Sequence, residues 1–64
     1  MDLNKLPEVR KIRLQMDWSQ LELARRLGVS QSLISYIEKG LVAITPELQK
    51  KIDNLKKEHS IETK

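Results

Sequence analysis

The sequence predicts an all-α fold of four or five helices. Three observations support this prediction. Apolar residues recur at helical spacing along the chain, Ser or Thr precedes three of the apolar segments at the position of an N-cap, and 64 residues are enough for only one small core. We therefore expect a single domain over residues 1–64.

The first helix is expected over about residues 5–16, opening at Asn4 or Leu6. Its apolar residues share an arc of about 120°: Leu6, Val9, Ile12 and Met16. Arg13 falls inside this arc, and an unpaired buried charge would cost several kcal/mol. Glu38 is the obvious partner for a structural salt bridge. The alternative is that Arg13 reaches solvent and Glu38 is an ordinary surface acid.

The second helix is expected over residues 20–27. Ser19 is in place as its N-cap, Glu22 as the capping-box partner, and Trp18 as a hydrophobic staple against Leu23. Its inward face carries Leu23, Ala24 and Leu27. As the single tryptophan, Trp18 also invites the alternative of ligand stacking, but its place before an N-cap favours a core position.

Gly28 suits the left-handed backbone that ends a helix, and Ser30 is a new N-cap, so a third helix is expected over about residues 31–39. Its apolar side holds Leu33, Ile34 and Ile37, whereas the other side holds Gln31, Ser32, Ser35, Tyr36 and Lys39. The polar side carries no carboxylate, and Glu38 lies at its border with the apolar side. Two short helices joined by this tight turn form a helix-turn-helix, whose acid-free face can approach phosphates and base edges.

An apolar loop, Leu41 to Ile44, follows Gly40. We expect Leu41 and Ile44 to close the core. Val42 and Ala43 are then either an exposed dimer contact or covered by the fourth helix.

The fourth helix is expected over about residues 46–57, with Thr45 as N-cap and Pro46 in its first turn. Its apolar stripe is Leu48, Ile52 and Leu55, and its water-facing residues are Lys50, Lys51, Asp53, Lys56 and Lys57. Residues 58–64 are expected to form a tail in which Ile61 docks locally.

Composition and the absence of certain motifs limit the functions that the chain can have. The net charge of +3 permits nucleic acid as a partner without predicting it. The absence of cysteine and of any long apolar run predicts a cytoplasmic protein without disulfides, with no membrane partner. The sequence contains no phosphate loop, no nucleophile paired with a base and no ligand partner for His59, so we expect no enzyme, no cofactor and no metal.

The pattern resembles the lambda-repressor-like, or Xre, family of DNA-binding domains over about residues 5–57. The matching residues are Gln20, Leu23, Ala24, Gly28, Ile34, Ile37, Glu38 and Gly40. The resemblance implies a compact all-α domain that inserts the Gln31 helix into the major groove of double-stranded DNA and usually represses transcription as a homodimer. It also implies that Arg13 pairs with Glu38. Relatives commonly have basic residues in the loop after Gly40 and a fifth helix in the dimer interface, and this sequence shows neither.

Base contacts are expected from Gln31, Ser32, Ser35 and Tyr36, and backbone contacts from Gln20, Lys39 and Gly40. A Gln at the start of the third helix can bond N6 and N7 of adenine, and a Ser can bond several base edges. Tyr36 either meets DNA or covers the flank of the helix, and Ser35 either meets DNA or simply permits close approach. Gln20 can meet a phosphate at the positive end of the second helix, and the resemblance implies the same role.

Two other functions remain open. The fold could serve as a protein-interaction module, antitoxin-like or adaptor-like, that binds a partner through the loop from Leu41 to Ile44. It could also serve as an architectural or recombination accessory factor, which would share the DNA contacts. Acids on the recognition face would favour the protein-interaction module, and Gln31, Ser32, Ser35 and Tyr36 provide none.

Overall fold

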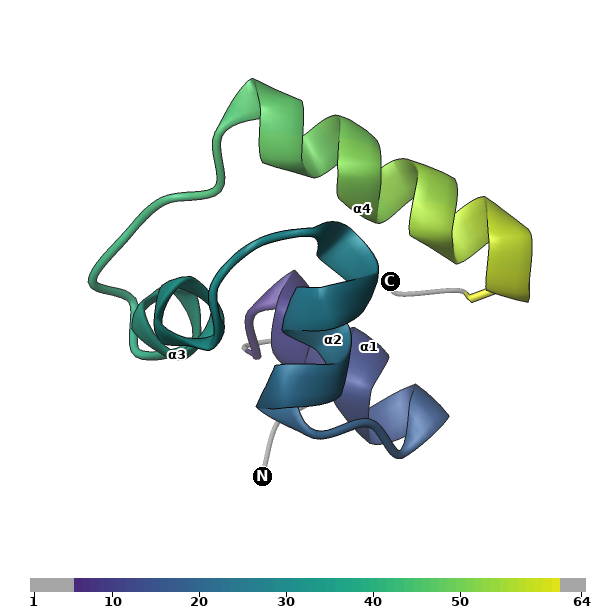
Figure 1. Cartoon of the computed structure of the whole chain (residues 1–64), viewed down its shortest axis with the longest axis horizontal. Helices are drawn as coiled ribbons and strands as arrows, with labels where there is room; N and C mark the ends of the chain where they lie inside the picture. Colours follow the sequence, from purple (N-terminus) through teal and green to yellow (C-terminus); the bar gives the residue numbers. More distant parts are fainter. Residues whose placement is uncertain (1–5, 62–64) are drawn as a thin grey trace.

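The computed structural model describes residues 6–61, and in that range it contains four α-helices and no strand (Figure 1). They are α1 (Glu8–Met16), α2 (Gln20–Leu27), α3 (Gln31–Glu38) and α4 (Pro46–His59). The predicted all-α fold is confirmed.

Three helix ends differ from the prediction. The smallest difference is in α3, which ends at Glu38, one residue before the predicted end. Helix α1 begins at Glu8, because Pro7 disfavours helical backbone at Leu6 and is itself the extended N-cap. Asn4 lies outside the described residues. Helix α4 continues to His59, two residues beyond the predicted end, and stops where Ser60 adopts left-handed backbone at φ 52°.

Side-chain caps begin three of the helices, as predicted. The hydroxyl oxygens of Ser19, Ser30 and Thr45 accept hydrogen bonds from the third backbone N–H that follows, at 3.0, 3.1 and 3.2 Å. Such a cap contributes about 1 kcal/mol. The Glu22 carboxylate was expected to complete a capping box, but instead its Oε2 lies 3.3 Å from Nε of Arg26 on the next turn.

Buried side chains from all four helices form one core. Its members are Val9, Ile12, Leu23, Ala24, Leu27, Ile34, Ile37, Leu48, Ile52, Leu55 and Ile61. The predicted apolar faces of α2 and α4 are therefore confirmed. Ile61 docks as expected, since the chain turns at Ser60 and the Ile61 N–H donates to the Lys56 carbonyl at 2.8 Å.

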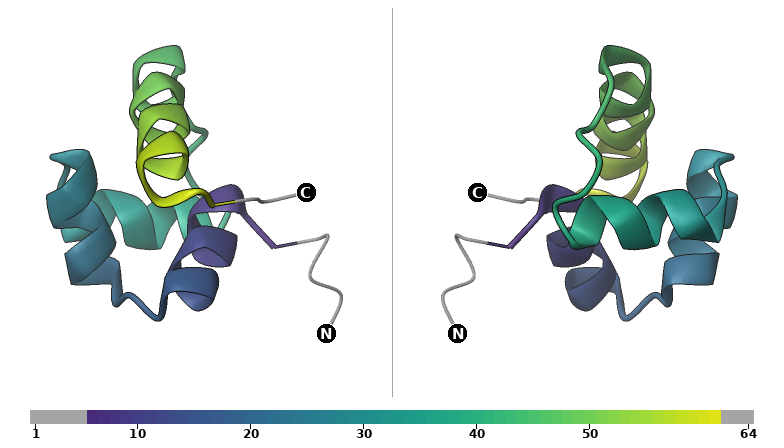
Figure 2. Two further views of the ribbon diagram at one scale, coloured as in Figure 1. Left: turned by 90° about the vertical axis from the view of Figure 1, so that its right-hand side faces the viewer. Right: turned by 90° about the vertical axis from the view of Figure 1, so that its left-hand side faces the viewer.

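Helix α3 lies along one side of the molecule, and α4 stands above it (Figure 2, right). Helices α1 and α2 pack behind α3 in that view, and α4 passes above the end of α2 (Figure 1). The start of α1 is tied to α4 because Glu8 Oε1 accepts from Nε2 of Gln49 at 3.2 Å and lies 3.8 Å from Nζ of Lys56. Lys56, which was expected to face water, is therefore largely covered at its side chain.

Replacing Ser60 by glycine should stabilise the fold. Left-handed backbone costs an L-residue about 1–2 kcal/mol, and the extra chain entropy of glycine offsets part of that gain. We expect a net gain of about 0.5–1 kcal/mol, or about 4 °C in Tm, measured by thermal unfolding. Gly28→Ser is the matched reverse change, since Gly28 has φ 70°, and it should lower Tm. A lower Tm for Ser60→Gly would contradict this account.

Candidate nucleic-acid interface

The turn between α2 and α3 fixes the angle at which α3 is presented. Gly28 adopts φ 70° and its N–H donates to the carbonyls at the end of α2, while the Val29 N–H donates to the Ala24 carbonyl at 3.0 Å. A Cβ on Gly28 would meet nothing within 4 Å, so it is the backbone angle that requires glycine. Ala24, 1% exposed, is small enough to let the two helices pack closely.

Helix α3 has one buried face and one exposed face. Ile34 and Ile37 are buried, whereas Gln31 and Ser32 at its start are exposed. No other described helix or loop lies over the outer side of α3 (Figure 2, right). The side-chain amide of Gln31 and the hydroxyl of Ser32 are therefore accessible to a large partner.

The other residues predicted to contact DNA differ in their exposure. Tyr36 is 47% exposed, which fits both a DNA contact and a cover over the flank, and Ser35 is half-buried. Lys39 is exposed at the C-cap. Gly40 is exposed with φ 77°, and Gln20 is half-buried at the first position of α2. The base and backbone roles assigned to these residues stay predictions.

Arg13 and Glu38 form a two-pronged ion pair between α1 and α3. Nε of Arg13 donates to Oε2 of Glu38 and Nη2 donates to Oε1, each at 2.8 Å, while Nη1 donates to the Trp18 carbonyl at 3.2 Å. The Glu38 side chain is only 4% exposed. Its hydrogen bonds raise the pKa of Arg13 above the ordinary value; burial opposes this shift and the Glu38 charge adds to it. Because the pKa of Arg13 is raised in the folded state, its charged form stabilises the fold, and this stability is lost only as the pH rises through that pKa. The free energy of unfolding therefore gains no pH dependence near neutrality from Arg13.

Arg10 is a second arginine at this pair that sequence reasoning missed. Its Nη1 lies 3.8 Å from Oε1 of Glu38, and its Nε is buried without a hydrogen-bond partner among the described residues. Arg10 lies three residues before Arg13, and residues at that spacing share a helix face. This spacing was the signal available in the sequence.

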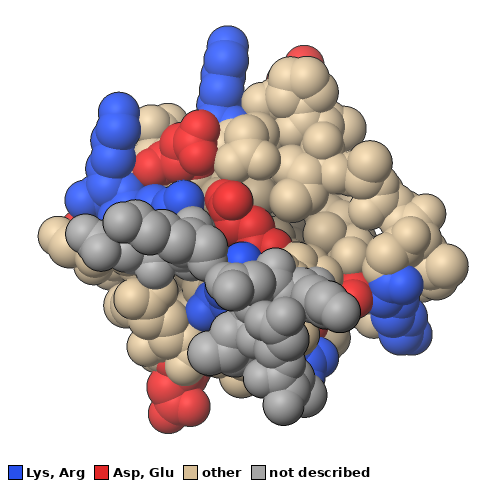
Figure 3. Space-filling model, turned by 180° about the vertical axis from the view of Figure 1, so that it is seen from behind, with Lys and Arg blue, Asp and Glu red and all other residues tan. Residues whose placement is uncertain are grey.

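The surface over α3 and the loop that follows it is nearly uncharged. Between Val29 and Pro46 the only charged residues are Glu38, which is neutralised by Arg13, and Lys39. Figure 3, seen from behind, shows this region on the right as mostly neutral, while Lys, Arg, Asp and Glu gather over the opposite part. Any attraction of this face for phosphates must rest mainly on polar groups and backbone N–H donors.

The expected closure of the core by the loop after Gly40 is only half right. Ile44 packs against the core, but Leu41 is 70% exposed, which overturns its predicted place there. The Leu41 N–H donates to the Tyr36 carbonyl at 2.9 Å, which holds this residue at the end of α3 outside the core. Val42 and Ala43 are also exposed, so helix α4 does not cover them.

Trp18 is half-buried and packs against the core, as predicted. The Arg26 guanidinium lies 4.2 Å from the centroid of its ring, and the His59 ring meets it edge-on at 5.2 Å. The contact with His59 could not be predicted, because the two residues lie far apart in the chain. Trp18 therefore joins the ends of α2 and α4.

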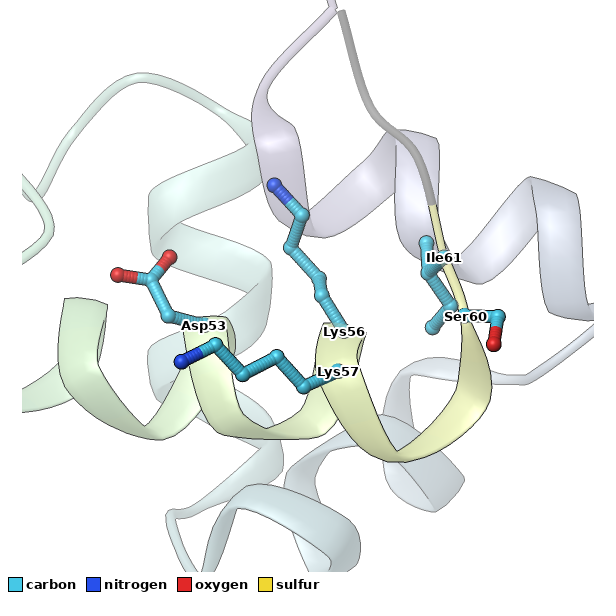
Figure 4. A pocket seen from close by; sticks show the side chains of 5 residues that line it. All are labelled: Asp53, Lys56, Lys57, Ser60 and Ile61. Carbon is cyan, nitrogen blue, oxygen red and sulfur yellow. The ribbon is translucent and has the colours of Figure 1, made fainter.

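A shallow hollow of about 480 Å³ lies at the end of α4, lined by Asp53, Lys56, Lys57, Ser60 and Ile61. In Figure 4, Lys56 extends toward the start of α1 and Lys57 toward Asp53. None of the residues expected to contact DNA lines this hollow.

Across residues 6–61, no group of three or more His, Cys, Asp or Glu side chains is placed to hold a metal ion. None of the helices in that range has the length and apolar character required to span a bilayer.

Of three comparisons with known proteins, the one with protein families finds a match. Neither a curated protein nor a solved structure matches the chain. Residues 9–55, more than half of the chain, match the helix-turn-helix family, whose members are in general DNA-binding transcription regulators and not typically enzymes. With the turn at Gly28 and the exposed face of α3 in place, this match shows that the chain belongs to the lambda-repressor-like, or Xre-type, helix-turn-helix family.

Proposed function

We propose that the chain binds double-stranded DNA at a specific sequence by placing the outer face of α3 in the major groove. The observation that carries this proposal is the exposure of Gln31 and Ser32 on a face that no other described element covers. Its only acid, Glu38, is 4% exposed and paired, so no free carboxylate opposes the phosphates. Eight residues make α3 about 12 Å long, which fits a groove about 12 Å wide.

Gln31 and Ser32 would read base edges, since an amide can bond adenine at N6 and N7 and a hydroxyl can bond several bases. Tyr36, one turn further along, adds either a thymine contact or a phosphate contact, and Ser35 permits close approach. Gln20 at the positive end of α2, the Lys39 ammonium and the Gly40 backbone would hold phosphates and set the register.

The chain would act as a dimer, most simply as a repressor that occupies a two-fold operator. Its half-sites would then lie about one helical turn, or about 34 Å, apart. Leu41 and Val42 expose 70% and 38% of their surface. Because this loop carries no charge, two copies of the chain can meet there without placing like charges in direct contact.

Selection of bound sequences from random duplex DNA tests the proposal. We expect enrichment of one site with two-fold symmetry. Recovery of unrelated sequences after several rounds would contradict specific reading by α3. A single enriched half-site would keep the reading but overturn the dimer.

One observation favours a second function. The exposed, uncharged loop at Leu41 and Val42 is also suited to a protein partner, as in an adaptor that uses the same fold. Failure of the DNA selection, together with an intact fold, would favour this alternative. An accessory role in DNA architecture or recombination would give the same DNA contacts and differ only in its effect on genes.

A further inference from the structure

We propose that the groove between the end of α2 and the middle of α4 is a docking site for an acidic peptide segment of a partner protein. The groove has a volume of about 350 Å³. Its lining includes the basic side chains of Arg25, Arg26 and Lys51, the apolar side chains of Leu27 and Leu55, and the amide of Asn54. Its lining residues come from the end of α2, the glycine that follows it, and α4; Figure 1 shows the upper end of α2 close to α4.

The charge of the groove is positive and largely unneutralised. Arg25 and Lys51 are exposed, and within residues 6–61 neither has a carboxylate partner at ion-pair distance. Arg26 lies over the Trp18 ring and 3.3 Å from Glu22, so its charge is partly balanced. Glu58 is the one carboxylate in the lining. An anionic partner would therefore find two available cations.

The rest of the lining fits a peptide. Leu27 and Leu55 form an apolar floor, and the exposed side-chain amide of Asn54, which has no hydrogen-bond partner among the described residues, can meet peptide N–H and C=O groups. The volume falls at the lower end of the range for small-ligand pockets, enough for a few side chains. A rigid duplex would touch only the rim of such a hollow, whereas an extended chain can place carboxylates beside the cations and an apolar side chain on the floor.

The groove is separate from the proposed DNA-binding face. No lining residue belongs to α3, and none is among the residues expected to contact bases or phosphates. The two surfaces can therefore be occupied together. The inference does not depend on DNA binding, and a failed DNA selection would leave it standing.

The test uses the whole chain and a blocked hexapeptide of alternating glutamate and leucine. We expect the peptide to shift the backbone amide signals of residues 25–28 and 51–55 in NMR spectra, and to change Trp18 fluorescence because Arg26 lies against that ring. The same peptide with lysine in place of glutamate should do neither. Arg25→Glu/Lys51→Glu should weaken binding about tenfold or more.

The matched control is Lys50→Glu/Lys57→Glu, which makes the same change of charge at exposed residues that do not line the groove. It should weaken binding by less than about threefold. Equal weakening by the two double variants would reduce the effect to general charge attraction and overturn the proposal. So would amide shifts that avoid residues 25–28 and 51–55, or stronger perturbation of those amides by random duplex DNA than by the peptide. Arg25→Ala/Lys51→Ala, with circular dichroism as the fold check, repeats the test without introducing new acids.

Discussion

Replacing Arg13 by methionine is expected to lower the free energy of unfolding by about 3 kcal/mol. Both bonds to the Glu38 carboxylate are lost, and that side chain is only 4% exposed. Its charge is then left buried, and within residues 6–61 only Arg10, at 3.8 Å, remains at ion-pair distance. A domain of this size is stable by only a few kcal/mol, and Tm should fall by 10 °C or more, as about 4–8 °C per kcal/mol implies. Thermal and urea unfolding followed by circular dichroism measure the loss.

The control for this prediction is the double variant Arg13→Met/Glu38→Met. Replacing both partners removes the buried charge together with the pair, so most of the stability should return, to within about 1 kcal/mol of the original chain. An unchanged Tm for Arg13→Met would show that Arg13 does not lock α1 to α3. A double variant as unstable as the single one would show that the loss came from packing of the arginine side chain.

Gln31→Ala is expected to weaken binding to the selected operator by about 1–3 kcal/mol, roughly fivefold to 150-fold, and to relax the preference for one base pair. The physical reason is the loss of two hydrogen bonds to a base edge, with no change in the fold, because the side chain is exposed. Binding titrations with the operator and with single-base variants of it measure both effects.

Lys39→Ala is the matched control, since it removes another exposed side chain at the far end of α3. A phosphate contact carries no sequence information, so this change should weaken all duplexes alike and reduce the slope of log K against log salt by about 1. If both variants weakened operator and random DNA by the same factor, the division between base-reading and phosphate-holding residues would be wrong.

Most of the fold could be predicted because its signals are local. Ser19, Ser30 and Thr45 each satisfy a backbone N–H three residues away, and Gly28 supplies a backbone angle that other residues avoid. Apolar spacing then identified the buried faces of α2, α3 and α4, since a short helix can bury only one side. These features depend on neighbours within a turn or two of helix.

The errors in the fold arose where distant residues decide the outcome. Leu41 was assigned to the core from its hydrophobicity, but the end of α3 and the path to α4 hold it outside. Lys56 was predicted to face solvent, but its Nζ lies 3.8 Å from Oε1 of Glu8, which comes from the other end of the chain. Sequence spacing contains no information about such pairings.

The residues of the candidate site could be predicted only in part. Gln31 and Ser32 are exposed as the helical positions required, and Arg13 meets Glu38 in the geometry that a buried charge demands. The approach of Arg10 to the same carboxylate was not predicted, because its side chain is 40% exposed and its place on α1 does not by itself require a partner. Which atoms of α3 touch a duplex depends on the partner, and no pattern within the chain determines that.

The scarcity of charge over α3 has a consequence for how the protein would be distributed in a cell. Binding to DNA through this face would release few counterions, and the affinity for non-specific DNA would therefore be low. Little of the protein would then be bound at non-specific sites of a genome. Occupancy of the correct site would then respond closely to the number of molecules made, and only slightly to changes in ionic conditions.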